Sequence, residues 1–152
     1  METVKHLLSA PYGTVHTELT SYHFGKPGGP KAYIQAALHA DEVPAMLVAQ
    51  ELRKRLQALD AAGKVTGEVI LVPAANPIGL AQVINERPFG RFDLSNGINF
   101  NRGYPHYFEQ LKARLVGQLG SDAEANVRTI RRHLRELVAQ WQPTSDATTL
   151  KK

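Results

Sequence analysis

The chain has 152 residues, of which 43% are hydrophobic, so it is long enough for one domain with a core and too short for two of ordinary size. It contains no cysteine, which excludes disulfides and thiolate ligands, so any metal must be bound by His, Asp or Glu. No apolar run approaches the roughly 20 residues that span a bilayer, and the N-terminal segment lacks the apolar stretch of a signal peptide. We therefore expect a cytoplasmic protein with no membrane partner.

The net charge of +4 raises the question of nucleic-acid binding. Four arginines carry much of this charge and lie between residues 128 and 135, a pattern typical of the solvated face of a helix. Aromatic residues make up 7% of the chain and do not alternate with basic residues as a base-stacking surface requires. We therefore expect no nucleic-acid partner.

The first predicted elements are two strands. Residues 13–24 alternate β-branched or aromatic positions with polar ones, and GKPGGP then interrupts the pattern. A second run, KAYIQAALH at residues 31–39, is apolar almost throughout, which is typical of a strand buried on both faces. The sequence thus predicts a hairpin of these two strands.

A helix and another strand are predicted next. Apolar residues recur at helical spacing up to Gly63, a C-terminal stop, and Asp41 and Pro44 suit the N-cap and the first turn. The strand GEVILVPAANP follows, so that strand, helix and strand form a βαβ unit. The sequence therefore predicts an α/β fold with a mixed, partly parallel sheet flanked by helices.

Residues 76–104 form a long segment without a sustained period. This segment is rich in Gly, Asn and Arg but keeps frequent aromatic and apolar residues, which favours an ordered functional loop over a flexible linker. One helix is predicted after Pro105, and another from Ser121, which forms a capping box with Glu124. The polar tail after Pro143 is expected to fray.

Three sequence pairs of the form HxxE can each supply two ligands of a hydrolytic zinc site. They are His39 with Glu42, His106 with Glu109, and His133 with Glu136. The third pair lies beside the apolar stripe of an amphipathic helix, where such a pair is an ordinary surface interaction. In the second pair, the helix dipole already explains a glutamate in the first turn.

His39 has a different setting. It lies at the carboxyl end of a predicted strand, with Glu42 in the first turn of the next helix, where open α/β sheets place their ligand sites. The alternative is a hydrogen-bonded histidine at a strand end, with Glu42 completing a cap alongside Asp41. The long loop favours a site, because arginine grips a carboxylate through two parallel hydrogen bonds and asparagine adds a directional partner. It supplies Arg87, Arg91, Asn101 and Arg102.

Three segments resemble a known family. They are the strand and HADE turn at residues 31–42, VPAANPIG at 72–79, and GRFDLSNGINFNRGYP at 90–105. Together they are similar to the aspartoacylase and succinylglutamate desuccinylase family, a branch of the zinc carboxypeptidase clan. The resemblance implies a zinc carboxypeptidase-like fold and a zinc-dependent amidohydrolase that cleaves an amide (acyl) bond of a small N-acylated amino acid or related compound.

The resemblance also implies roles for particular residues. His39 and Glu42 match the family's HxxE pair, which binds Zn²⁺. Asn101 and Arg102 match its Asn-Arg pair, which binds the carboxylate of a small-molecule substrate.

A third role in the family belongs to an arginine that supports the polarised carbonyl. Arg91 is our choice for this catalytic residue, and Arg87 is the alternative.

Two parts of the family's site do not appear in the sequence. The family takes a third ligand from a histidine in an Asp-Leu-His context and its general base from a later glutamate, and neither motif is present here. We therefore expect a single domain, residues 1–152, that is the N-terminal part of a zinc-hydrolase catalytic domain. A truncated sheet would expose an edge and an apolar face, which favour association into a homo-oligomer.

Two other functions stay open at this point. A metallocarboxypeptidase that acts on peptides could use the same Asn-Arg pair to hold the terminal carboxylate of its substrate. A non-catalytic binding module could keep the fold and the anion grip without the metal.

Overall fold

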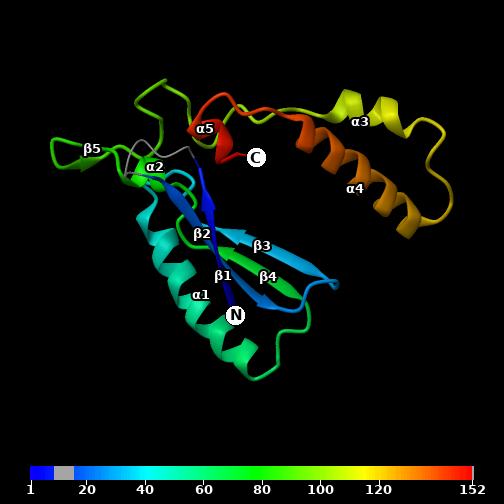
Figure 1. The fold of residues 1–152 in the computed structure, drawn as a ribbon, viewed down its shortest axis with the longest axis horizontal. Coiled ribbons are helices and arrows are strands. Elements are labelled where there is room, and N and C mark those ends of the chain that lie inside the picture. Colours follow the sequence, from blue (N-terminus) through cyan, green and yellow to red (C-terminus); the bar gives the residue numbers. More distant parts are fainter. Residues whose placement is uncertain (9–15, 152) are drawn as a thin grey trace.

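The computed structural model describes residues 1–8 and 16–151, and its main element is a four-stranded mixed sheet (Figure 1). In spatial order the strands are β1 (Glu2–Leu7), β2 (Glu18–Gly25), β4 (Glu68–Val72) and β3 (Lys31–Gln35). β2 is antiparallel to both of its neighbours, whereas β3 is parallel to β4. The predicted α/β fold with a mixed, partly parallel sheet is confirmed.

The predicted hairpin between residues 13–24 and 31–39 is wrong. β2 and β3 are not neighbours, because β4 lies between them and pairs with both. The turn after β2 therefore leads into a crossover rather than into a hairpin, and β2 pairs instead with β1, a strand that was not predicted. Residues 13–15 of the predicted first strand lie outside the described residues.

The predicted burial of the second strand on both faces is also wrong. All five residues of β3 are exposed, because this strand lies at the edge of the sheet and the helix of residues 43–61 packs against β2 and β4 instead. Burial begins after the strand, in residues 36–40, each at most 8% exposed. The apolar character of KAYIQAALH thus serves the turn that leads into the next helix.

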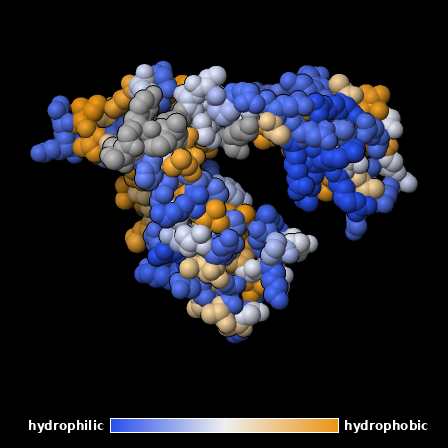
Figure 2. Space-filling model, viewed as in Figure 1, coloured by the Kyte–Doolittle hydropathy of each residue, from blue (hydrophilic) through white to orange (hydrophobic). Residues whose placement is uncertain are grey.

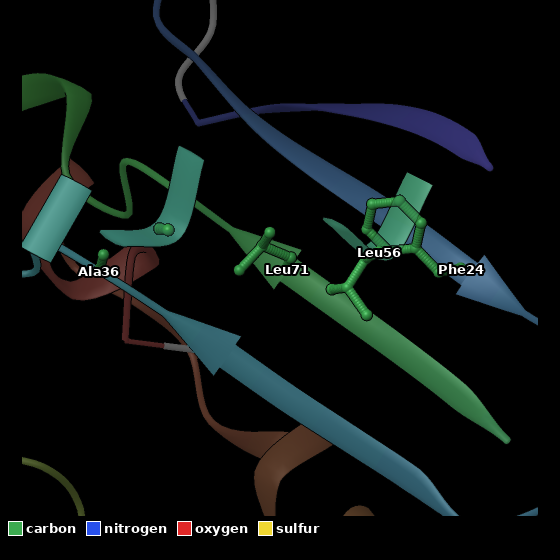
Figure 3. Close-up of a cluster of buried hydrophobic side chains, with 5 residues drawn as sticks. Phe24, Ala36, Leu56 and Leu71 are labelled. Atoms are coloured by element: carbon green, nitrogen blue, oxygen red, sulfur yellow. The ribbon is translucent and has the colours of Figure 1, made fainter. Parts of the chain in front are cut away.

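The helix α1 (Val43–Ala61) packs on one face of the sheet, against β2 and β4. A cluster of buried side chains joins the two layers (Figure 3). Its members are Phe24, Ala36, Ala49, Leu56 and Leu71. Two of them, Phe24 and Leu71, are at most 1% exposed, so the core lies between β2, β4 and this helix.

The two ends of α1 were predicted unequally well. Gly63 follows the helix with φ +68°, a conformation that suits glycine, and Pro44 lies in the first turn, both as predicted. Asp41 is not the N-cap. Glu42 takes that position without a capping hydrogen bond, and the Asp41 carboxylate contacts Arg91.

The long segment after β4 is largely irregular, and the C-terminal part is helical. The segment contains α2 (Pro77–Leu80) and a two-stranded sheet of β5 (Val83–Ile84) and β6 (Arg87–Pro88). The helices α3 (Phe108–Leu115) and α4 (Ala123–Gln140) pack against each other as a helical hairpin. This helical hairpin extends away from the sheet, and a hollow separates the two (Figures 1 and 2). In the described part of the chain, no helix is long and apolar enough to cross a membrane.

Two details of this helical part differ from prediction. Asp122 caps α4 by accepting hydrogen bonds from the backbone N–H groups of Glu124 and Ala125, so the predicted capping box at Ser121 does not form. The tail that was expected to fray contains a one-turn helix, α5 (Asp146–Thr149).

Candidate metal and substrate site

The site is built on the turn between β3 and α1, which Asn76 anchors. Asn76 follows β4, is 0% exposed, and donates its Nδ2–H to the carbonyl of Leu38 at 2.9 Å. Its Oδ1 accepts the N–H of Gly79 at 2.8 Å. The segments that follow the two parallel strands are thereby tied together, and His39 is held next to this junction.

The loop that carries Arg91 packs on the same turn through Gly90. The N–H of Ala40 donates to the carbonyl of Gly90 at 2.8 Å. A β-carbon at Gly90 would lie 2.4 Å from the nitrogen of Asp41 and 2.7 Å from the carbonyl carbon of Ala40, both backbone atoms. Glycine is therefore required for this approach, which brings Arg91 to His39.

Gly90→Ala is expected to lower the free energy of unfolding by about 1–3 kcal/mol, because two backbone segments must separate to admit the methyl group. Urea unfolding of the protein measures this change. Gly120→Ala is the control, since a β-carbon there meets no heavy atom within 4 Å. Equal stability losses in the two variants would contradict the close approach.

His39 is the central residue of the site. Its side chain is 4% exposed, and both ring nitrogens have partners. Nε2 lies 2.9 Å from Asn99 Oδ1, and Nδ1 lies 2.8 Å from a terminal nitrogen of Arg91. Nδ1 is also 3.3 Å from Glu42 Oε1, although Glu42 is half exposed. A buried imidazole therefore points one nitrogen into the loop and the other toward a carboxylate.

The separation of His39 Nδ1 and Glu42 Oε1 tests whether this pair fits a metal. Two ligand atoms bound to zinc at about 2.0–2.1 Å in tetrahedral geometry lie about 3.3 Å apart. The observed distance is 3.3 Å, so the donors fit two adjacent positions around such an ion. Within residues 1–8 and 16–151, however, no three His, Cys, Asp or Glu side chains gather as a metal site. The described residues thus offer two candidate ligands, fewer than the three protein ligands of a catalytic zinc site.

Distance alone does not distinguish this pair from the others. His133 Nδ1 and Glu136 Oε2 are also 3.3 Å apart, on α4. His133 Nε2 lies 2.9 Å from Gln118 Oε1, and Glu136 pairs with Arg114 of α3 at 3.2 Å. These contacts join the two helices of the hairpin, as expected for an ordinary surface pair. His106, before α3, stays a weaker candidate because the sequence setting of Glu109 explains that pair.

Arg91 is the arginine that the structure brings to His39. Besides its bond to Nδ1, its guanidinium lies 3.3 Å from Asp41 Oδ2 and 3.4 Å from Glu42 Oε1. Arg87 lies in the exposed strand β6, and in the described part of the chain its guanidinium forms no hydrogen bond or salt bridge with His39, Asp41 or Glu42. The geometry favours Arg91 over Arg87 as the arginine of the site, while its catalytic role stays a prediction.

Asn101 and Arg102 join the site indirectly. The N–H of Asn101 donates to Asn99 Oδ1 at 2.9 Å, the same oxygen that contacts His39. The Arg102 guanidinium donates to the carbonyl of Asn101 at 2.7 Å and is exposed. The pair is therefore connected to His39 through Asn99, which lies two positions before Asn101.

Tyr104 and Lys151 flank this Asn-Arg pair. The Tyr104 hydroxyl donates to Asn101 Oδ1 at 3.3 Å, and burial raises the pKa of this tyrosine. The Lys151 ammonium donates to the carbonyl of Arg102 at 2.6 Å and lies 5.7 Å from the centre of the Tyr104 ring. Desolvation by burial lowers the pKa of Lys151. Arg102 and Lys151 therefore place two cations at this end of the loop, which suits an anionic group.

Asn99 is the site residue that sequence reasoning missed. It lies between Ile98 and Phe100, and Phe100 is 0% exposed. The signal that could have identified Asn99 is its position, next to a buried aromatic residue and two positions before the Asn-Arg pair.

Comparisons with known proteins show which solved structures share this fold. A succinylglutamate desuccinylase/aspartoacylase family protein from Shewanella amazonensis SB2B has a similar structure, with 28% sequence identity and a TM-score of 0.77. The similarity covers 99% of this chain and 41% of that one, so the chain spans about two-fifths of that protein. A counterpart from Shewanella frigidimarina NCIMB 400 shares the fold at 23% identity and a TM-score of 0.73, over 98% of this chain and 41% of its own.

The family assignment rests on a separate match. The model of the succinylglutamate desuccinylase/aspartoacylase catalytic domain matches residues 28–147. The chain therefore belongs to the succinylglutamate desuccinylase/aspartoacylase family. No curated protein sequence matches the chain.

Proposed function

We propose that this chain is part of a zinc-dependent hydrolase that cleaves an amide (acyl) bond of a small N-acylated amino acid or a related compound. The observation that carries the proposal is the separation of 3.3 Å between His39 Nδ1 and Glu42 Oε1, beside Arg91, in a member of this family. The carboxylate of the substrate is the partner proposed for the Asn-Arg pair.

Each residue has a role in this proposal. His39 and Glu42 would hold the zinc ion. When bound, zinc supplies Lewis-acid activation of water and polarisation of the carbonyl. Arg91 carries N–H donors next to both ligands and would hold the oxygen on which negative charge develops. Asn101 and Arg102 would grip the substrate's carboxylate and fix the position of the scissile bond.

The described residues do not supply every group that this reaction needs. The family resemblance implies a third histidine ligand and a glutamate base, and no described residue joins His39 and Glu42 in a group of three. A non-catalytic module that keeps the fold and the anion grip is therefore a second candidate to be tested. The cytoplasmic location and the lack of a nucleic-acid partner stay predictions.

Hydrolysis by the complete natural protein that contains residues 1–152 tests these alternatives. N-succinylglutamate, N-acetylaspartate and a peptide with a free C-terminus serve as substrates. Release of the free amino acid from an N-acyl substrate, lost with a chelator and restored by Zn²⁺, supports the proposal. Cleavage of the peptide alone would favour a carboxypeptidase, and metal-free protein that binds carboxylates without hydrolysis would favour the module.

A further inference from the structure

One side-chain oxygen of Asn99 has two hydrogen-bond partners. Oδ1 lies 2.9 Å from the backbone nitrogen of Asn101 and 2.9 Å from Nε2 of His39. Asn99 and His39 are 60 positions apart in the sequence, so this contact joins the loop to the β3–α1 turn. One amide oxygen thus connects the proposed metal ligand to the proposed carboxylate-binding pair.

The chemistry of these donors fixes the tautomer of His39. A backbone N–H can only donate, so the Asn99 atom that faces Asn101 is an acceptor and is the amide oxygen. The ring nitrogen that faces the same oxygen must then carry a hydrogen, which places the proton on Nε2. Neutral imidazole has one N–H, and Nδ1 is therefore left with a lone pair.

Arg91 gives the same answer independently. A guanidinium has donors and no acceptor, and one of its terminal nitrogens lies 2.8 Å from Nδ1 of His39. Nδ1 must accept this hydrogen bond, so it carries the lone pair. Two donors from different parts of the loop thus agree on the protonation of the ring.

We propose that Asn99 is a positioning residue that holds His39 with its hydrogen on Nε2, so that the lone pair of Nδ1 is left on the side of the ring that faces Arg91 and Glu42. This inference rests on the proposed function in one respect, since it assigns Nδ1 as the nitrogen that binds the metal. A partner behind a metal-ligating histidine fixes both tautomer and ring orientation. Arg91 cannot hold the ring in this way when a metal is bound, because an Nδ1 lone pair that binds a metal can no longer accept a hydrogen bond from Arg91.

Zinc affinity is the first readout, measured by titration of the protein with Zn²⁺. Asn99→Leu removes the acceptor and is expected to weaken zinc binding by about 10- to 100-fold. Asn99→Asp keeps an acceptor oxygen and is expected to bind zinc at least as tightly as the wild type. Asn96→Leu is the matched control, because Asn96 bonds to Asp93 and Ile98 within the same loop. An equal loss in Asn96→Leu, or no loss in Asn99→Leu, would overturn the proposal.

The tautomer of His39 is a second readout that needs no metal. Nitrogen-15 NMR of the imidazole reports it, with the signal assigned by its loss in His39→Gln. Because Arg91 favours the same tautomer, the comparison is made in Arg91→Gln protein. The Nε2–H form should persist there and give way to a mixture when Asn99→Leu is added. Persistence of the Nε2–H form in the double variant would refute the role of Asn99. A wild-type protein that binds no zinc would refute the proposed function alone.

Discussion

His39→Ala is expected to lower the zinc affinity of the complete natural protein by more than about 100-fold and to reduce hydrolysis to background. Changing a residue that hydrogen-bonds to a metal ligand already lowers metal affinity by about 10- to 100-fold, and His39 would be a ligand itself. Its side chain is 4% exposed, so the alanine variant also leaves the Asn99 oxygen with one donor fewer. Zinc titration and a hydrolysis assay measure the two effects.

Two further variants make this result specific. Glu42→Gln removes the second proposed ligand at a half-exposed position, where loss of folding is not expected, and should also weaken zinc binding. His133→Ala is the matched control, because its HxxE pair has the same separation of 3.3 Å on the helical hairpin. Zinc binding that persists in His39→Ala and in Glu42→Gln but is lost in His133→Ala would assign the zinc site to α4 instead.

Arg91→Gln is expected to change catalysis and metal binding in opposite directions. Removing one preorganised donor to a developing oxyanion costs about 10²- to 10³-fold in kcat. In the wild type, the lone pair of His39 Nδ1 accepts a hydrogen bond from Arg91, and the positive charge of Arg91 disfavours a zinc ion nearby. Zinc binding should therefore become tighter in Arg91→Gln. The Arg91 side chain is 43% exposed, so solvent screens this repulsion and the gain should be modest.

Arg87→Gln separates this role from a general effect of loop charge. Arg87 lies in the exposed strand β6 and was the alternative for the carbonyl-supporting arginine. It should leave both kcat and zinc affinity close to those of the wild type. A larger fall in kcat for Arg87→Gln than for Arg91→Gln would reverse the assignment.

The candidate site could be predicted in part, because its main residues lie in segments with local signals. His39 and Glu42 are three positions apart on one turn, so their side chains can meet within a short stretch of chain, and His39 Nδ1 lies 3.3 Å from Glu42 Oε1. Spacing did not choose among the three HxxE pairs, and the structure repeats the same distance at His133. Position after a parallel strand, together with the family's segments, made the distinction.

The remaining parts of the site depend on contacts that no local pattern encodes. Asn99 meets His39 across 60 positions, and Arg91 meets it across 52. Which arginine of the loop reaches the turn is decided at Gly90, where the backbone lies too close to Ala40 for any side chain. Asp41 was predicted as a cap from its position before the helix, but a salt bridge to Arg91 competes for its carboxylate.

By itself, the sequence determined the elements whose signals are local: the helix that ends before Gly63, the parallel βαβ unit, and the family's motifs. Periodic burial and backbone preferences act over a few residues, so they can be recognised without a partner. Only the tertiary structure decided the strand order, since β4 lies between β2 and β3 and makes β3 an exposed edge. It alone also brought Asn99 and Arg91 to the ring nitrogens of His39, because these contacts join segments that lie far apart in the chain.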